Sequence, residues 1–286
     1  MSAAILVDVT KCTGCERCVD ACVEENGLDP VQAQKDRATT EDGLSGNRLL
    51  SILQVEDGRF ARMSCMHCVE PSCVSACLVG GITKTPEGPV VYDPDKCIGC
   101  RYCMLACPFH VPRYEWDETL PYMKKCAMCF QRLDDGLEPA CVEACPNDAL
   151  HFGERDDLLR KAHDLIASNR GRYVDRVWGE HEFGGTSVLY LSDVDLASLG
   201  WPAPDTEAIP SLTEPLIEKT PFIGLSVAGG LLGLNWIIQR RRRLGAEAVA
   251  AQDEGAGGAA GPTASKAATE GEDAGEAGKL AERSST

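Results

Sequence analysis

The sequence predicts an α+β domain rich in cysteine, followed by one apolar helix and a tail of low complexity. Two observations lead to this prediction. All sixteen cysteines of the 286-residue chain lie between positions 12 and 145. Residues 222–238 carry no charged side chain, and residues 245–286 contain no aromatic one. We therefore expect a cysteine-rich domain over 1–153, an extension and linker over 154–220, a membrane-spanning helix over 221–239, and a basic stop with a disordered tail over 240–286.

The cysteines form four groups of four, here called runs one to four. In chain order the runs are Cys12, Cys15, Cys18 and Cys22; Cys65, Cys68, Cys73 and Cys77; Cys97, Cys100, Cys103 and Cys107; and Cys126, Cys129, Cys141 and Cys145. Run three reads CIGCRYCMLACP, which has the C-x2-C-x2-C-x3-C-P spacing that bacterial ferredoxins use to hold 4Fe-4S clusters. Because the four runs use every cysteine, the spacing predicts four 4Fe-4S clusters.

Disulfides and zinc are the competing uses of so many cysteines. A secreted protein could join them all in pairs, but disulfide frameworks have no reason to repeat one spacing. Structural zinc sites take their ligands in twos, which leaves the third and fourth cysteine of each run without a role. The repeated spacing therefore favours iron–sulfur clusters.

The spacing also bears on which runs share clusters, because the fourth cysteine of a ferredoxin run binds the cluster of its partner run. Nineteen residues separate Cys77 from Cys97, an interval that suits a two-cluster unit, so runs two and three are expected to pair. Runs one and four would then form an outer unit, and PNDALHF after Cys145 mirrors LVGGITK after Cys77. The alternative pairs run one with two and run three with four, since eighteen residues between Cys107 and Cys126 would also allow a unit.

The order of the runs resembles one protein family. The segments CMHCVEPSCVSAC, CIGCRYCMLACPFHVPRYEW, CVEACPNDALHFG and YVDRVWGEHEFGGTSVLYL are similar to those of the iron–sulfur electron-transfer subunits of membrane-bound respiratory oxidoreductases. That family serves enzymes such as hydrogenase 2, formate dehydrogenase N and the dimethyl-sulfoxide and polysulfide reductases. The resemblance covers residues 5–240. It implies two nested bacterial-ferredoxin-like units, the inner one at 65–107 and the outer one formed by 12–22 with 126–145.

The resemblance also implies how the ligands are shared. Each cluster would take three cysteines from one run and the fourth cysteine of the partner run. The implied sets are Cys12, Cys15, Cys18 with Cys145; Cys126, Cys129, Cys141 with Cys22; Cys65, Cys68, Cys73 with Cys107; and Cys97, Cys100, Cys103 with Cys77. Val23 and Leu78 stand where a proline often follows the fourth cysteine, which loosens the backbone there without removing a ligand.

The remaining elements follow from apolar patterning. Strands are expected at residues 3–9, 49–55, 90–92 and 186–191. Residues 154–170 place leucine and isoleucine at helical spacing, which predicts a helix packed on the cluster domain. The proline-rich segment 200–221 is expected to be an extended linker. Trp116, Trp178 and Tyr173 are interpreted as packing residues rather than electron relays.

Residues 222–238 read FIGLSVAGGLLGLNWII, and their number lies at the short end of the roughly 17–25 residues that span a bilayer. Trp236 and the four arginines at 240–243 are typical of a membrane boundary. Because basic residues favour the cytoplasmic side, the C-terminus is expected in the cytoplasm and the cluster domain on the periplasmic side. A buried helix of a soluble core is the alternative. Gly229 and Gly233 offer a face for close packing against an integral-membrane partner.

No export signal precedes the first run, so the folded domain is expected to cross the membrane together with a partner that carries a twin-arginine signal. This expectation agrees with the resemblance to formate dehydrogenase N more than with the resemblance to hydrogenase 2, whose subunit usually has its own signal.

Together these observations predict a non-catalytic electron-transfer subunit, because the sequence offers no nucleophile with its base and no phosphate-binding glycine loop. Electrons are expected to pass between a catalytic subunit and a quinone-reactive integral-membrane subunit. A nickel–iron hydrogenase is favoured as the catalytic partner, with a molybdenum or tungsten formate dehydrogenase second. The alternatives are a free-standing membrane-tethered polyferredoxin and a subunit of a dimethyl-sulfoxide or polysulfide reductase. With 44 acidic against 28 basic side chains, nucleic acid is not expected as a partner.

Overall fold

The computed structural model describes residues 2–116, 119, 121–196, 199, 201 and 206–256. The chain divides into one compact unit over Met1–Thr220 and a second over Pro221–Thr286. The extension that follows the last cysteine run therefore belongs to the same compact unit as the runs themselves.

A three-stranded sheet closes the first unit, with β1 (Ala3–Asp8) between two strands from distant parts of the chain. β8 (Leu150–Glu154) runs antiparallel to β1. β9 (Val188–Leu191) runs parallel to β1, with Ile5 opposite Val188. The N-terminal strand thus fixes the segment after run four and the C-terminal extension to one another.

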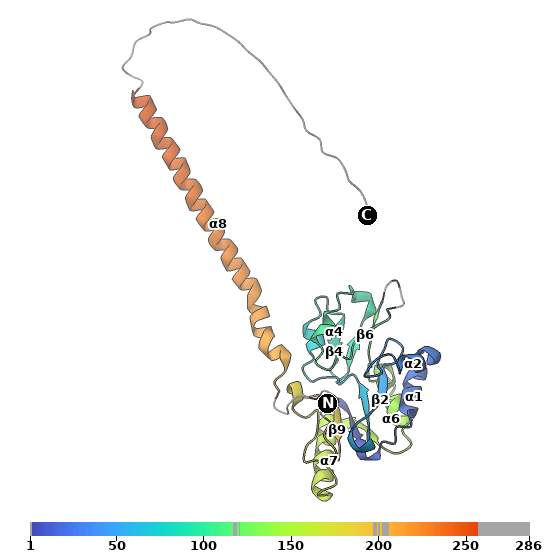
Figure 1. The fold of residues 1–286 in the computed structure, drawn as a ribbon. Coiled ribbons are helices and arrows are strands. Elements are labelled where there is room, and N and C mark those ends of the chain that lie inside the picture. The colour runs from blue at the N-terminus through green and yellow to red at the C-terminus, as the bar shows by residue number, and fades with distance from the viewer. Residues whose placement is uncertain are drawn as a thin grey trace. The chain divides into compact units, whose positions relative to one another are not determined.

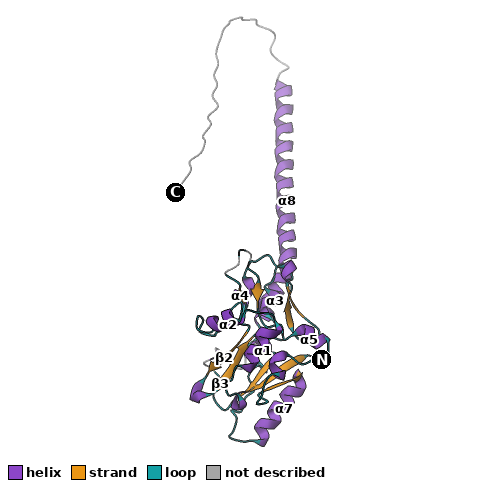
Figure 2. Ribbon diagram, turned by 90° about the vertical axis from the view of Figure 1, so that its right-hand side faces the viewer, coloured by secondary structure: helices purple, strands orange, loops and turns teal. Residues whose placement is uncertain are grey.

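The two faces of β1 pack into two different cores, because successive side chains of a strand point to opposite faces. Ile5 and Val7 belong to the large core that also contains cysteines of runs one, two and four. Ala4 and Leu6 pack against α7 (Arg155–Ser168), which lies along the sheet (Figure 2). All four side chains are buried. β1 is therefore the middle strand of the sheet and also contributes to both cores.

The helix predicted over 154–170 is confirmed as α7, and its sequence explains its start and its buried face. Asp156 and Asp157 lie in the first turn, where the positive end of the helix dipole stabilises acidic side chains. Leu158 and Ala162, four residues apart, form the buried stripe. The strands predicted at residues 3–9, 49–55, 90–92 and 186–191 are also confirmed, with ends that differ by at most about two residues.

Short hairpins and helices carry the cysteine runs. The antiparallel hairpins are β2 (Leu50–Gln54) with β3 (Phe60–Ser64), β4 (Ile82–Lys84) with β5 (Val90–Tyr92), and β6 (Arg113–Tyr114) with β7 (Met123–Lys124). The short helices are α1 (Arg17–Glu25), α2 (Pro30–Asp36), α3 (Ser72–Ser75), α4 (Tyr102–Ala106), α5 (Phe130–Asp134) and α6 (Ala140–Glu143). The 3-10 turns are Val9–Lys11, Glu56–Gly58, Pro94–Lys96 and Glu182–Gly184.

The packing of the short helices brings particular runs together. α1 of run one packs on α6 of run four (Figure 1), and α3 of run two packs on α4 of run three (Figure 2). Runs two and three therefore lie together, with the β4–β5 hairpin between them in sequence. Runs one and four lie together although runs two and three separate them in sequence. This is the nested arrangement expected of an α+β fold with an inner and an outer ferredoxin-like unit.

α8 (Ile209–Ala256) is a single helix of 48 residues. By length and composition it can cross a membrane, and none of its apolar stretch is buried in the described structure. Side chains at positions 211–252 are all exposed. A helix of a soluble core would be largely covered, so α8 is a membrane-anchor candidate and the core-helix alternative is not supported.

Two predictions about the ends of this helix are wrong. The predicted linker is helical from Ile209 onward, and residues 200 and 202–205 of it lie outside the described residues. The predicted tail is helical up to Ala256 rather than disordered from residue 245. Pro210 lies in the first turn, where its missing N–H is not needed, and Leu212, Glu214, Leu216, Glu218 and Lys219 favour helix although Pro215 and Pro221 do not. Alanine and glutamate have the same effect beyond position 245. The rest of the predicted tail, 257–286, lies outside the described residues.

Replacement of Leu6 by alanine should destabilise the first unit, because Leu6 is fully buried between β1 and α7. We expect Leu6→Ala to cost about 2–5 kcal/mol and to lower the thermal unfolding midpoint. Circular dichroism melting of the full chain in detergent measures this change. Leu137→Ala is the matched control, since Leu137 is 51% exposed; equal losses in the two variants would contradict a central role for β1.

Candidate iron–sulfur sites

Each cysteine run begins with the same backbone turn. In the first C-x-x-C segment of each run the residue before the second cysteine has a left-handed φ: Gly14 at 70°, His67 at 47°, Gly99 at 70° and Met128 at 56°. Glycine adopts this conformation freely, whereas a histidine or methionine must be held in it by its surroundings. The turn aims backbone N–H groups at the first thiol of the run, as where Met128 N–H donates to Cys126 Sγ at 3.3 Å. A backbone turn of this kind can bind an anionic group through its N–H donors.

A second turn supports the fourth cysteine of runs two and four. Gly81 N–H donates to Cys77 Sγ at 3.1 Å, and Ala149 N–H donates to Cys145 Sγ at 3.4 Å. In both cases the donor lies four residues after the thiol. The parallel expected between the segments after Cys77 and Cys145 is therefore confirmed.

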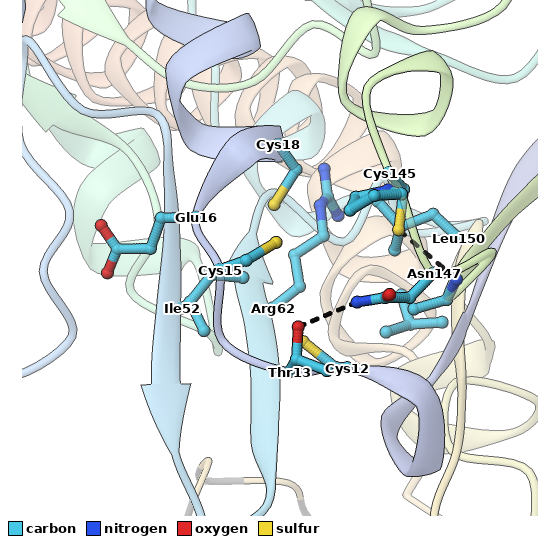
Figure 3. Close-up of a pocket in the computed structure, with 13 residues that line it drawn as sticks. Cys12, Thr13, Cys15, Glu16, Cys18, Ile52, Arg62, Cys145, Asn147 and Leu150 are labelled. Carbon is cyan, nitrogen blue, oxygen red and sulfur yellow. Dashed lines mark hydrogen bonds between the residues drawn. The ribbon is translucent and has the colours of Figure 1, made fainter.

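The first outer cavity is lined by three cysteines of run one and the fourth cysteine of run four. These are Cys12, Cys15, Cys18 and Cys145. Figure 3 shows the side chain of Arg62 among them. The Asn147 side-chain amide donates to the Thr13 hydroxyl at 2.8 Å, which joins the two runs at the edge of the cavity.

The second outer cavity has the reciprocal composition, with three cysteines of run four and the fourth cysteine of run one. These are Cys126, Cys129, Cys141 and Cys22. The Asn26 side-chain amide lies 3.6 Å from Cys22 Sγ, and Arg62 lines this cavity too. The structure thus brings together, in both outer cavities, the cysteines that the family resemblance implied.

Runs two and three exchange cysteines in the same way around the first inner site. Burial raises the pKa of Cys68 well above its ordinary value, and the thiols of Cys65, Cys107 and Cys73 raise this pKa further. Burial also raises the pKa of Cys73 to about 12, again with Cys65 as the thiol of largest effect. Cys65, Cys73 and Cys107 are therefore near neighbours of Cys68, and Cys107 is the member from run three.

The second inner site holds the first three cysteines of run three. The pKa of Cys103 is raised, first by burial and then by the neighbouring Cys100 and Cys97 thiols. Gly81 lies between this group and Cys77. The Gly81 N–H donates to Cys77 Sγ, and a Cβ added to Gly81 would lie 3.6 Å from the Cys97 backbone nitrogen. Any larger residue at position 81 would enter the space between the two runs.

The raised pKa values of these thiols indicate which kind of cofactor the cavities could bind. Burial raises the pKa of Cys18 to about 12 and that of Cys129 to about 11. Such thiols keep their protons at neutral pH unless a cation replaces them, and iron supplies that positive charge. In the described part of the chain, no three or more Cys, His, Asp or Glu side chains are arranged around the position of one ion. The four cysteine sets fit a guest larger than a single zinc ion, such as a 4Fe-4S cluster.

Basic side chains accompany the cysteines, and sequence reasoning missed them. Arg62 and Lys125 are buried, and Lys84 is half-buried. The Lys84 ammonium donates to the Cys68 carbonyl at 2.9 Å, and burial lowers the pKa of Lys84 to about 8. Lys125 donates to the Val90 carbonyl. The one signal in the sequence was a basic residue in, or directly after, a short strand next to a run. Nothing in the sequence distinguishes an inward from an outward side chain at these positions.

The aromatic residues singled out from the sequence divide into two groups. Trp178 is 1% exposed and Tyr173 packs beside α7, so the packing interpretation holds for both. Trp116 is 57% exposed and lies outside the core, where its ring packs against Tyr114 with 5.8 Å between the ring centres. The Arg101 guanidinium lies 4.5 Å from the centre of the Trp116 ring, a cation–π contact at the surface.

Comparison with known proteins agrees with this chemistry. Residues 57–155 match the family described as the 4Fe-4S dicluster domain. The chain is 33% identical over 281 residues to the hydrogenase-2 operon protein HybA of Escherichia coli O157:H7, across 85% of this chain and 85% of that protein. It is 34% identical over 205 residues to the iron-sulfur subunit of the nitrate-inducible formate dehydrogenase of Escherichia coli K12, across 66% of this chain and 67% of that subunit. Identity to the B subunit of the anaerobic dimethyl sulfoxide reductase of the same strain is 39% over 163 residues, across 56% of this chain and 78% of that subunit.

Four complete cysteine sets predict the metal content of the protein. We expect about sixteen iron and about sixteen acid-labile sulfide per chain after purification without air. Colorimetric iron and sulfide assays, scaled to protein by amino-acid analysis, measure both. A value near half of this would show that two runs hold no cluster, and a dominant 3Fe-4S signal in electron paramagnetic resonance (EPR) would show that one set lacks a ligand.

Proposed function

This chain belongs to the family of iron–sulfur electron-transfer subunits of respiratory oxidoreductases, and we propose that its catalytic partner is a nickel–iron hydrogenase and its acceptor a quinone-reactive integral-membrane subunit. It carries four 4Fe-4S clusters and is not itself the catalytic subunit. The choice of hydrogenase is supported by the alignment with HybA, which extends over 85% of both chains, whereas the formate dehydrogenase alignment covers about two thirds of each. A molybdenum or tungsten formate dehydrogenase is the second candidate.

The observation that carries this function is the row of four cysteine sets. Each cluster supplies a one-electron redox centre, and the chain determines where the centres lie. The two outer sets are neighbours because Arg62 lines both of their cavities. The two inner sets are neighbours because the Cys103 thiol is close enough to Cys73 to raise its pKa. The inner and outer pairs of sets meet at Lys125. Burial raises the pKa of Cys73 in the first inner set, the charge of Lys125 opposes this rise, and Lys125 directly precedes Cys126 of the second outer set.

The ends of the row are proposed from exposure. Of the sixteen cysteines, Cys15 of the first outer set and Cys100 of the second inner set are exposed. A surface cysteine places its cluster within electron-transfer distance of a docked partner. At the Cys100 end, Leu78 is 71%, Ile98 63% and Leu105 81% exposed. Exposed apolar groups of this size support a contact with the integral-membrane subunit at that end.

The ligand sets themselves are part of the proposal. The nested pairing of runs is supported by the two outer cavities and by the contact of α3 with α4. The alternative, in which run one pairs with two and run three with four, would need Cys22 near run two, whereas Cys22 lines a cavity with Cys126 and Cys141.

The membrane orientation is also proposed. α8 is the anchor candidate, and the four arginines at 240–243 follow its apolar part. The bias of basic residues toward the cytoplasm supports a cytoplasmic C-terminus and a periplasmic cluster domain. Gly229 and Gly233 lie on the exposed surface of α8, where an integral-membrane subunit can pack closely.

Copurification tests the partner proposal. A tagged full-length chain, extracted in mild detergent from cells grown without air, should bring down one catalytic subunit at a fixed ratio, and mass spectrometry identifies it. A nickel–iron hydrogenase subunit is the expected result. A dimethyl sulfoxide reductase catalytic subunit, favoured by the identity to the B subunit of that enzyme, or a chain that purifies alone as a polyferredoxin, would overturn the assignment.

Substitution of Cys77 tests the exchange of ligands between runs two and three. If Cys77 completes the set of Cys97, Cys100 and Cys103, then Cys77→Ser should alter that cluster and leave the one at Cys65 intact. EPR spectra of reduced protein, compared with Cys97→Ser as the matched variant of the same set, measure the change. Loss confined to the cluster of Cys65, Cys68 and Cys73 would refute the exchange.

Protease accessibility tests the orientation. Protease added to intact spheroplasts should digest the cluster domain and spare an epitope placed after residue 256, because the arginines at 240–243 hold that end in the cytoplasm. Immunoblots with antibodies to each part measure the result, and lysed spheroplasts provide the control. A cut tail with a protected cluster domain would place the electron donor in the cytoplasm.

A further inference from the structure

Arg62 is a fully buried arginine between the two outer cavities. It is the third residue of β3, and its side chain is 1% exposed. It lines the cavity of run one as well as the cavity of run four. Figure 3 shows its guanidinium between Cys18 and Cys145 in the first of these cavities. Its Nη2 also lies 3.8 Å from Cys141 Sγ in the second.

The guanidinium of Arg62 has no carboxylate beside it in the described part of the chain. Its Nε and Nη1 have no hydrogen-bond partner among those residues, although both are buried. Arg48, a second fully buried arginine, differs because its Nη2 pairs with the Glu16 carboxylate at 3.3 Å. A buried cation without a counter-ion is strongly unfavourable. The balancing negative charge must therefore come from whatever fills the two cavities.

The position of Arg62 is fixed by the fold around it. Arg62 pairs with Ile52 across the β2–β3 hairpin. The Tyr190 hydroxyl, from β9 in the C-terminal extension, donates to the Arg62 carbonyl at 2.6 Å. Two strands and a hydrogen bond hold the backbone, and the whole residue is buried, so the charge stays in the interior.

We propose that Arg62 is the shared counter-ion of the two outer clusters and raises the reduction potential of both. This inference rests on the proposed ligand sets. A 4Fe-4S cluster held by four thiolates is negatively charged, and reduction adds one more electron. A fixed cation that is buried away from bulk solvent stabilises the reduced state more than the oxidised state. Arg62 is a positioning residue in this role, since it sets the electrostatic field at the clusters and is not one of their ligands.

Three full-length variants, studied in the same complex as the natural chain, separate charge from shape. Arg62→Met removes the charge and keeps most of the side-chain volume. Arg62→Lys keeps the charge. Arg59→Met is the matched control, because Arg59 immediately precedes β3 in the same hairpin but pairs with Asp193 and is 40% exposed. Redox titration followed by EPR gives the potential of each cluster, and iron analysis gives the cluster content.

In Arg62→Met we expect the ratio of reduced to oxidised cluster at fixed potential to fall at least tenfold for two of the four clusters. For a one-electron couple this is a decrease of about 59 mV or more. The other two clusters, assigned to runs two and three, should keep their potentials and serve as internal references. Arg62→Lys should restore most of the change, and Arg59→Met should show none.

Several results would overturn the proposal. One is Arg62→Met with full iron content and four unchanged potentials, and another is an equal shift of all four clusters. If Arg62→Met loses iron, the Lys variant decides: retention of all iron at nearly natural potentials supports the counter-ion role, whereas equal iron loss in both variants shows that shape, not charge, matters. Failure of the cluster assignment itself would be seen separately, as low iron content in the natural chain.

Discussion

Burial of thiol groups is the constraint on which the rest of the domain depends. A thiolate enclosed by protein and surrounded by other thiols is unfavourable, which is why the pKa values of Cys18, Cys68 and Cys73 are all raised. Iron removes the protons and offsets the charge, so cluster binding and folding are coupled. The repeated left-handed turns contribute the backbone N–H groups that a negatively charged cluster needs, and glycine occupies that position in two of the four runs.

The same constraint explains the basic side chains in the interior. Arg62, Lys84 and Lys125 each stand next to cysteines rather than next to carboxylates. In a protein without clusters, buried cations of this kind would lower stability. Here the negative charge of the cysteine-bound clusters and the positive charge of the buried side chains offset one another. Either charge would be unfavourable in the interior without the other.

The C-terminal extension has a structural role in this arrangement. β9 adds a parallel strand to β1, and Tyr190 on that strand reaches the backbone of Arg62 in the β2–β3 hairpin. The extension therefore supports the outer pair of cysteine sets from outside the runs. The side chains of α8 at positions 211–252 are exposed, which leaves its apolar stretch available to contact lipid or an integral-membrane subunit.

The sequence by itself determined the local chemistry. C-x-x-C spacing places two thiols on one turn and the runs repeat it, so the number of clusters, and the similar segments after Cys77 and Cys145, could be predicted from neighbouring residues alone. The membrane-anchor helix could likewise be predicted from one continuous segment, because residues 222–238 carry no charged side chain. Only the tertiary structure decided which fourth cysteine enters which cavity, because Cys145 meets run one through the pairing of β1 with β8. It also decided that Arg62 points inward and that Trp116 does not, since the side of a short segment that becomes buried depends on the distant elements packed against it.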